Sequence, residues 1–594
     1  MNTLLWVLAG VLVYSAAATA LSTRGYLPDA VRVQGPLTTL HTTVGRRFLG
    51  WVAGPRRFWR AWSNLGVGVA LVVMAGMFLF LLRGAAVTLQ NPTATTANQP
   101  SNFLLVPGVN DFLPLAVAPE IVAGLAIALV VHEAGHGLLY RVEGVDLDSL
   151  GLVLFTIVPI GAFAQPVGEE GRLDIDRGAN NRVFAAGVTN NFAVTIVAYA
   201  LLFGPVIGAI TAAPGVAVAG VYPGTAASDA GIGPGDRITA VGDRPIDGAD
   251  ELNAALDDVG DPSVEIGVNG ETTTTLDRRV VVIGTSPGNP AGFSVAGDGE
   301  AITVSAVNGT TVRTEAAFED AAARHELARL ETSAGNLTVP LGAYVQSSSA
   351  SLAGSDGPPA NTSLVVTRLD GRRIVGDAAL SSSLAERSPD ETVSLRAYVD
   401  GEFQNYTVTL GEGPQGDATL GGVARGTSGL VVGDVGVRTY PAESYLALLG
   451  GSVSPPGPLS GLVDSALGLV FATLLLPLAG AIGILPYNFA GFYGDVANFY
   501  DVTGPLAAAG ETPVFLAANV LFWTAWVNLQ LGVFNCIPGY PLDGGRILRM
   551  VVEGVVSRLP VGNRERLVRT VTTSVGLVML ASLLLIMFGP QVLS

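Results

Sequence analysis

Apolar runs long enough to cross a bilayer are the feature that most constrains the fold of this chain. The hydrocarbon core of a bilayer is about 30 Å thick and takes about 20 helical residues to span. Seven such runs lie at residues 3–21, 64–82, 115–140, 182–212, 459–485, 513–537 and 570–588. With 14% charged residues and a mean hydropathy of +0.48, the chain has too little polar surface for a purely soluble enzyme. We therefore predict a polytopic α-helical protein that crosses the cell membrane several times.

A shorter apolar stretch at residues 150–164 lacks the character of a spanning helix. It is interrupted by Pro159 and Gly161. Irregular backbone at membrane depth must be shielded from lipid by protein, because its polar groups find no water there. We therefore expect a re-entrant loop or a hairpin packed against the protein interior.

The arginines predict the orientation of the helices, because short loops rich in basic residues stay in the cytoplasm. Arginines fill the loop between the first two runs and the loop after the sixth run, so both loops should be cytoplasmic. The direction of the sixth run then leaves two alternatives. Either residues 459–485 turn back near Pro477, or residues 150–164 cross the membrane and the polar middle of the chain is cytoplasmic. Four N-x-S/T sites in this middle region weakly favour the outside, at Asn308, Asn336, Asn361 and Asn405.

The charge balance excludes one class of partner and suggests a habitat. The formal net charge is -17, the wrong sign for a protein that binds nucleic acid through its phosphates. Lysine is absent, so all of the positive charge is carried by arginine. An acidic, lysine-free chain is typical of a halophile, in which molar salt screens the repulsion between carboxylates. High genomic GC content is the alternative reason for the lack of lysine.

The middle of the chain, about residues 214–450, is predicted to be an extramembranous β-rich insert. Short β-branched runs alternate there with Gly, Pro, Asp and Asn turn signals. Residues 215–252 resemble a PDZ domain of the bacterial protease-associated type, with a Gly-Val-x-Val strand, a Pro-Gly-Thr-Ala-Ala helix and a Gly-Asp turn. Parts of this pattern return at residues 302–309 and 365–398. We predict tandem PDZ-like domains, with a generic β-rich domain as the alternative.

The third apolar run carries the motif that points to chemistry. Residues 132–136 read HEAGH, which fits the pattern H-E-x-x-H. Positions i and i+4 of a helix share one face, so His132 and His136 can bind one zinc ion while Glu133 polarises the metal-bound water. Two buried structural histidines are the alternative, but they would not explain a Glu inside an apolar helix, where ionisable groups are costly and usually functional.

A catalytic zinc usually takes three protein ligands, so a third one is needed. His41 lies in the arginine-rich loop and His325 in the insert, which leaves Asp543 as the candidate. This lone carboxylate follows an apolar run and precedes an arginine-rich loop, which places it toward the cytoplasmic side. The HEAGH run also ends at that side, so the two can meet at similar depth. A turn aspartate before two glycines is the alternative.

Three motifs together resemble the site-2 protease family of intramembrane zinc metalloproteases: HEAGH at 132–136, FAAGVTNN at 184–191 and NCIPGYPLDGG at 535–545. The resemblance covers nearly the whole chain from about residue 115, although Tyr540 stands where bacterial members frequently have proline. It implies that His132, His136 and Asp543 bind Zn²⁺, and that Glu133 is the general base and acid. It also implies that Asn191 lies near the substrate.

The resemblance further implies the partners of the chain. Substrates would be transmembrane proteins already trimmed by an upstream site-1-type protease, and the lipid of the membrane would surround the enzyme; no nucleic-acid partner is expected. A helical substrate must unwind before it is cut, and the 150–164 stretch, with Gly161 in it, is a candidate edge against which the unwound segment could pair.

We predict six segments: N-terminal membrane helices with an arginine-rich loop (1–114), the first part of the protease core (115–213), a PDZ-like domain (214–290), a divergent PDZ-like region (291–425), a linker (426–458) and the second part of the core with the C-terminal helix (459–594). The predicted function is intramembrane peptide hydrolysis, in regulated intramembrane proteolysis. Two alternatives remain: a membrane-tethered HExxH protease that clips surface or misfolded proteins, and an inactive PDZ-bearing membrane scaffold.

Overall fold

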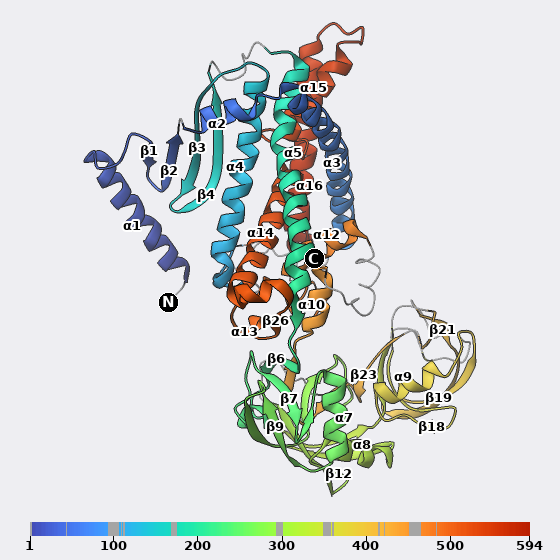
Figure 1. The fold of residues 1–594 in the computed structure, drawn as a ribbon. Helices are drawn as coiled ribbons and strands as arrows, with labels where there is room; N and C mark the ends of the chain where they lie inside the picture. Colours follow the sequence, from blue (N-terminus) through green and yellow to red (C-terminus); the bar gives the residue numbers. More distant parts are fainter. Residues whose placement is uncertain are drawn as a thin grey trace. The chain divides into compact units, whose positions relative to one another are not determined.

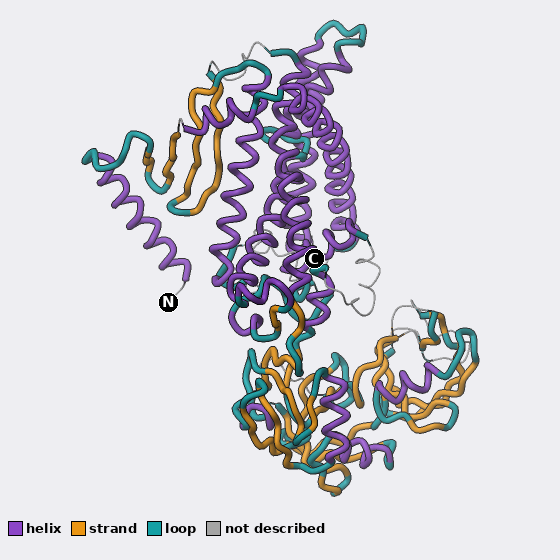
Figure 2. Tube along the Cα trace, viewed as in Figure 1, coloured by secondary structure: helices purple, strands orange, loops and turns teal. Residues whose placement is uncertain are grey.

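The chain folds into two compact units. The computed structural model describes residues 3–593 except 43, 93–105, 109, 111–112, 168–174, 293–300, 348–357, 359–361, 414–415, 421, 451–464 and 483. Unit 1 comprises Met1–Thr211, Glu443–Tyr493 and Asp501–Ser594, and unit 2 comprises Ala212–Ala442 and Gly494–Tyr500. Figure 2 shows that helix dominates unit 1 and strand dominates unit 2.

Five helices of unit 1, among the described residues, are long and apolar enough to cross a membrane. They are α3 (Arg56–Gln90), α4 (Ala118–Val142), α5 (Arg177–Leu201), α14 (Glu511–Asn535) and α16 (Arg564–Leu593). α4, α5 and α14 pack against one another, and α3 packs on α5 and on α16 (Figure 1). Local sequence sets the helix starts: Pro119 occupies the first turn of α4, and the Asp176 carboxylate accepts a hydrogen bond from the Ala179 N–H at 2.7 Å before α5.

Two of the seven predicted runs do not appear among these five helices. The first run is helix α1 (Thr3–Thr23), whose stretch Leu8–Thr23 is one of the shorter apolar helices. The prediction of a spanning helix at 459–485 is wrong. Its described part is the short helix α12 (Ala466–Leu475) with a 3-10 turn (Leu476–Leu478), and residues 459–464, like the Ser454–Pro458 linker sequence, lie outside the described residues.

The chain reverses direction directly after this short helix. The N–H groups of Ile484 and Leu485 both donate to the carbonyl of Ala479, and the Phe489 N–H donates to the carbonyl of Leu476. Pro477 at the start of the 3-10 turn cannot donate a backbone hydrogen bond, which weakens the continuation of the helix. This reversal is the turn that the first of the two topological alternatives requires.

The 150–164 stretch is a β-hairpin, as predicted. Its strands are β3 (Leu147–Phe155) and β4 (Val158–Pro166). They extend an antiparallel sheet of order β1-β2-β3-β4, in which β1 (Val31–Gln34) and β2 (Leu37–Thr42) come from the arginine-rich loop. These two strands were not predicted from the sequence. β4 is an edge strand of the sheet and packs against α4.

Unit 2 contains three copies of one strand-turn-strand-helix-strand-strand pattern. The first copy is β7 (Arg237–Val241), β8 (Arg244–Pro245), α7 (Ala249–Val259), β9 (Ser263–Val268) and β10 (Thr272–Asp277). The second is β12 (Ile302–Val307), β13 (Thr310–Thr311), α8 (Glu315–Ala323), β14 (Leu327–Thr332) and β15 (Gly335–Pro340). The third is β17 (Ser363–Leu369), β18 (Arg372–Arg373), α9 (Asp377–Ala385), β19 (Thr392–Val399) and β20 (Glu402–Thr409). Each copy buries its own apolar core, so the internal repeat predicted from sequence is present, while its identity as PDZ domains stays a prediction.

The three copies are nested, because the three leading strands, which precede the copies, pair in reverse order with three closing strands at the end of the unit. The leading strands are β6 (Val216–Val221), β11 (Val281–Thr285) and β16 (Ala343–Ser347). The closing strands are β23 (Gly422–Thr427), β24 (Leu430–Gly433) and β25 (Val437–Thr439). β23 pairs with β16, β24 with β11, and β25 with β6, all antiparallel. The first part of the segment predicted as a linker from residue 426 therefore contributes strands to these sheets, and helix α10 (Ala442–Leu448) follows.

The remaining elements are short or connect the larger ones. They are α2 (Val44–Val52), the turns Leu115–Val117, Leu202–Val206 and Ile207–Ala209, β5 (Ile210–Ala212), α6 (Ala226–Asp229), β21 (Gly411–Glu412), β22 (Ala418–Thr419), α10 (Ala442–Leu448), α13 (Gly494–Ala497), β26 (Tyr500–Val502), the 3-10 helix Gly504–Ala509 and α15 (Asp543–Val556).

Candidate metal centre

Helix α4 presents the two histidines of the HEAGH motif on one buried face. His132 is 6% exposed and His136 is 8% exposed. The glycine between them lets α4 approach α5 closely, because a Cβ on Gly135 would lie 2.8 Å from the carbonyl oxygen of Ala186. The spacing of the motif thus places both imidazoles against the neighbouring helix.

Asp543, more than 400 residues away in sequence, joins the two histidines. It is the first residue of α15, directly after the turn that follows α14, and it is 7% exposed. The Asp543 Oδ2 atom lies 3.1 Å from His132 Nε2 and 3.2 Å from His136 Nε2. The two Nε2 atoms are themselves 3.2 Å apart. The predicted third ligand is therefore brought to the two predicted histidine ligands, and the three atoms form a nearly equilateral triangle.

The chemistry of this triangle fits a divalent cation. His136 Nδ1 lies 2.8 Å from the carbonyl oxygen of Val183, so a neutral His136 carries its proton on Nδ1 and leaves a lone pair on Nε2. That lone pair faces the buried Asp543 Oδ2, which has no hydrogen-bond donor. Acceptor atoms turned toward one point in a dry interior are costly unless a cation satisfies them. Imidazole nitrogen and carboxylate oxygen are ordinary ligands of zinc, which takes them at about 2.0–2.2 Å.

One face of α5 forms the wall behind the two imidazoles. A Cβ on Gly187 would lie 2.7 Å from His136 Nε2 and 2.8 Å from His132 Cε1. Four residues further along the helix, the Asn191 amide also contacts the His132 ring, with Nδ2 3.4 Å from His132 Nδ1. Gly187 lies within the FAAGVTNN motif but is not among the predicted site residues; the available signal was a glycine four residues before the predicted Asn191.

The other predicted site residues lie on the elements that surround the triangle. Glu133 follows His132 on α4 and is half-buried. Gly161 lies in β4, where it pairs with Val153 of β3 beside a bulge. Asn191, predicted to lie near the substrate, contacts the ring of His132 rather than the triangle itself.

A charged cluster lies at one end of the helix bundle. Glu143, just after α4, binds Arg60 near the start of α3 at 2.8 Å and Arg182 near the start of α5 at 2.8 Å. The two guanidinium groups hold the pKa of the Glu143 carboxyl below its usual value, against the raising effect of its burial. This cluster ties the start of α3, the end of α4 and the start of α5 together.

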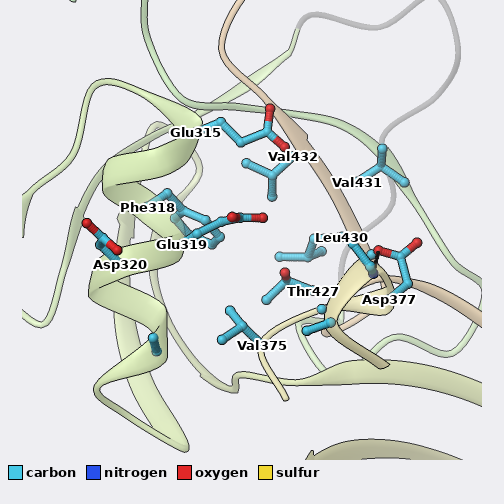
Figure 3. A pocket seen from close by; sticks show the side chains of 15 residues that line it. Glu315, Phe318, Glu319, Asp320, Val375, Asp377, Thr427, Leu430, Val431 and Val432 are labelled. Atoms are coloured by element: carbon cyan, nitrogen blue, oxygen red, sulfur yellow. Dashed lines mark hydrogen bonds between the residues drawn. The ribbon is translucent and has the colours of Figure 1, made fainter. Parts of the chain in front are cut away.

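Unit 2 contains a separate cavity of about 470 Å³ between α8, the start of α9 and the β23–β24 turn (Figure 3). Phe318, Val375 and Leu430 give it an apolar lining, and Glu315 and Glu319 are among the carboxylates at its wall. Burial, followed by repulsion from Asp434, raises the pKa of Glu315 to about 7. The residues that line this cavity include no histidine, cysteine or basic side chain, so it lacks the donor set of the triangle.

Comparison with known proteins agrees with the site. The model of peptidase family M50 matches residues 120–583, well over half of the chain. A Neisseria meningitidis protein named as a zinc metalloprotease is 23% identical over 480 residues, which cover 74% of this chain and 91% of that protein. Rip3 of Mycobacterium tuberculosis, also named as a zinc metalloprotease, is 48% identical over 44 residues, and these span only 11% of its length and 7% of this chain. An uncharacterised protein of Methanocaldococcus jannaschii is 28% identical over 147 residues, 24% of this chain and 38% of that protein.

The family and the names of these relatives imply a zinc cofactor, and the described residues contain one group of side chains able to hold it, His132, His136 and Asp543. The matched range includes both the HEAGH helix and the turn that carries Asp543, which are the two parts of the triangle. The chain belongs to peptidase family M50, the site-2 protease family that its motifs resemble.

Proposed function

We propose that the chain is an intramembrane zinc metalloendopeptidase, which hydrolyses peptide bonds within transmembrane segments of membrane proteins. One observation carries the proposal: the triangle of His132, His136 and Asp543 is buried among helices that are long and apolar enough to cross a membrane. A surface protease would hold its metal where water and soluble substrates reach it. An inactive scaffold would have no need of three cation-binding side chains at 3.1–3.2 Å.

Glu133 is the proposed general base and acid. When bound, zinc would lower the pKa of a coordinated water and polarise the scissile carbonyl. The Glu133 carboxylate is outside the triangle, so it is available to take the proton of the attacking water and return it to the leaving amine. The charge of Asp543 offsets half of the charge of a divalent cation, which lowers the cost of holding such a cation away from water.

The substrate is proposed to bind as an extended segment along β4. A helical substrate hides its carbonyls in hydrogen bonds between residues i and i-4, so it must unwind before it can be cut. β4 supports this step because it is an edge strand of its sheet and packs against the helix that carries His132 and His136. Addition of a strand to such an edge supplies backbone hydrogen bonds in place of the lost helical ones. Gly161, the proposed substrate-binding residue, lies in this strand.

The arginines and the chain connectivity favour an orientation with unit 2 outside the cell. The start of α5 belongs to the charged cluster of Arg60, Glu143 and Arg182, which the positive-inside rule assigns to the cytoplasm. α5 and the turns that follow it run from Arg177 to Ala209, long enough to cross the bilayer, and the chain enters unit 2 immediately afterwards. Unit 2, as a set of PDZ-like domains, would then admit membrane segments already trimmed by a site-1-type protease. The proposed location is the cell membrane.

The position of the cut tests the function. The purified chain in lipid vesicles is incubated with single-span membrane proteins, and the product ends are mapped by mass spectrometry. The proposal expects ends inside the transmembrane segment, nearer its cytoplasmic side, whereas ends in a juxtamembrane or soluble segment would favour a surface-clipping protease. Glu133→Gln is the control: it should abolish cleavage yet keep the zinc, because Glu133 is not one of the three atoms of the triangle. Loss of zinc in that variant would contradict its assigned role.

Labelling of single cysteines tests the orientation. The native cysteine, Cys536, is buried, so introduced cysteines can be read against a low background. In intact cells a membrane-impermeant maleimide should label Asn336→Cys in unit 2 and should reach Arg57→Cys at the start of α3 only after permeabilisation. The reverse pattern would place unit 2 in the cytoplasm.

A further inference from the structure

Helix α5 presents a buried asparagine to the ring of a metal-binding histidine. Asn191 is 0% exposed, and its Nδ2 atom lies 3.4 Å from His132 Nδ1. The opposite ring nitrogen, Nε2, is the atom that faces Asp543 Oδ2 and His136 Nε2. The Asn191 side chain therefore contacts the one nitrogen of His132 that the triangle does not use.

The proton of His132 must lie on the nitrogen next to Asn191. A metal-bound Nε2 donates its lone pair, so the neutral imidazole carries its hydrogen on Nδ1 and needs an acceptor there. The Nδ2 group of an asparagine is also a donor, and two donors cannot share a hydrogen bond. In the same structure the Asn191 Oδ1 atom is buried without a hydrogen-bond partner.

Rotation of the amide by 180° removes this conflict at the ring. Oxygen and nitrogen of an amide are nearly indistinguishable in size, and their assignment follows from the hydrogen-bond network. After rotation, Oδ1 accepts from His132 Nδ1–H and the amide nitrogen turns away from the ring. The second histidine has the same arrangement with a different acceptor, since His136 Nδ1 lies 2.8 Å from the backbone carbonyl of Val183.

We propose that Asn191 is a positioning residue that fixes the tautomer and the ring orientation of His132 through an Oδ1···H–Nδ1 hydrogen bond, and thereby sets the zinc affinity of the site. The proposal rests on zinc binding at His132, His136 and Asp543. Acceptors of this kind orient ligating histidines and raise their basicity, and their loss costs about 10–100-fold in metal affinity. The outer nitrogen of His136 faces a backbone carbonyl, whereas that of His132 faces a side chain, so the proposed outer hydrogen bond of His132 is the one that a side-chain substitution can remove.

The test compares two nearly isosteric substitutions. Their zinc affinities should rank in opposite orders depending on whether Asn191 orients His132 or only packs. Asn191→Asp keeps an acceptor at the same place, whereas Asn191→Leu has none but is apolar and suits a buried position. Zinc affinity of the full-length chain in detergent is measured by competition with a graded series of chelators. If Asn191 acts through His132, Asp should stay within about threefold of the native affinity while Leu loses about 10–100-fold. If the role of the residue is packing alone, Leu should match the native chain and Asp should be the weaker variant.

Asn190→Leu is the matched control, because Asn190 is the next residue on α5 and its Oδ1 accepts a hydrogen bond from Trp62 Nε1 at 3.2 Å rather than from an imidazole. It should keep native zinc affinity even if the α3–α5 contact weakens. Equal zinc loss in Asn190→Leu, or native affinity in Asn191→Leu, would overturn the proposal. If Asn191→Leu does not fold, Asn191→Ala carries the same expectation. Absence of zinc from the native chain would instead contradict the metal site itself, so the two failures are distinguishable.

Discussion

A single methyl group on α5 should disrupt the metal site. The Cβ of Gly187→Ala would lie 2.7 Å from His136 Nε2, 2.8 Å from His132 Cε1 and 2.9 Å from His132 Nδ1. An ordinary contact begins at 3.4 Å, so the rings or the helix must move by about 0.7 Å. Retreat of α5 from α4 would break the close packing of the Ala186 carbonyl on Gly135. Zinc–ligand distances tolerate only about ±0.2 Å, so a shift of this size should lower zinc affinity by at least the 10-fold that weaker perturbations cause.

The assay is zinc content after challenge with chelators of increasing affinity, with thermal unfolding measured in parallel. Gly66→Ala on α3 is the matched control, because its Cβ would clash with Thr189 of α5, the helix that carries Gly187, and its three nearest atoms all belong to that threonine. It should lower the unfolding temperature and keep the zinc. Gly68→Ala, whose Cβ meets no atom within 4 Å, should change neither property appreciably. Full zinc retention in Gly187→Ala, or equal zinc loss in Gly66→Ala, would refute the reasoning.

Two further predictions concern unit 2. Arg278 and Asp434 form a buried ion pair at 2.5 Å, and their side chains are 1% and 3% exposed. Asp434→Asn should therefore destabilise unit 2 by about 3–5 kcal/mol in hydrogen-exchange measurements, and replacement of both residues by leucine should recover most of that loss. A loss below about 1 kcal/mol in Asp434→Asn would contradict this prediction. Because burial raises the pKa of Glu315 to about 7, above the 4.5 of the unfolded chain, its stabilising contribution is present below pH 4.5 and is lost as the pH rises through 7. Between pH 4.5 and 8 the free energy of unfolding of unit 2 should therefore fall by up to about 3 kcal/mol less in Glu315→Gln than in the native chain. An unchanged pH profile would show that Glu315 is not the source of the fall.

The sequence by itself determined the chemistry of the site and the class of the fold. The HEAGH spacing assigns two imidazoles to one helix face because the helical period brings residues i and i+4 together. The apolar runs of α3, α4, α5, α14 and α16 were predicted by length and composition alone, since each run satisfies its backbone hydrogen bonds internally. The hairpin at residues 150–164 was predicted because proline and glycine interrupt an apolar stretch. The halophilic character stays a prediction from composition.

One prediction from length and composition failed because the tertiary structure makes an apolar segment turn. Residues 459–485 are apolar enough to span a membrane, yet the chain turns back after α12, because the polar backbone of the turn is satisfied by hydrogen bonds to Leu476 and Ala479. Hydropathy measures the side chains and cannot register such bonds. The same reason explains why β1 and β2 were missed within the arginine-rich loop.

Only the tertiary structure decided which distant parts of the chain meet. The sequence predicted Asp543 as the third ligand, with a turn aspartate as the alternative, and the structure places its Oδ2 atom 3.1 Å and 3.2 Å from the two imidazoles. Gly187 and Asn191 contact the imidazoles through the packing of α5 on α4, which no local pattern specifies. The closing strand β25 pairs with β6 across more than 200 residues, and so the three repeats are nested rather than consecutive. Strand pairing and helix packing are contacts between surfaces, and their free energy depends on the partner, which a segment's own sequence does not contain.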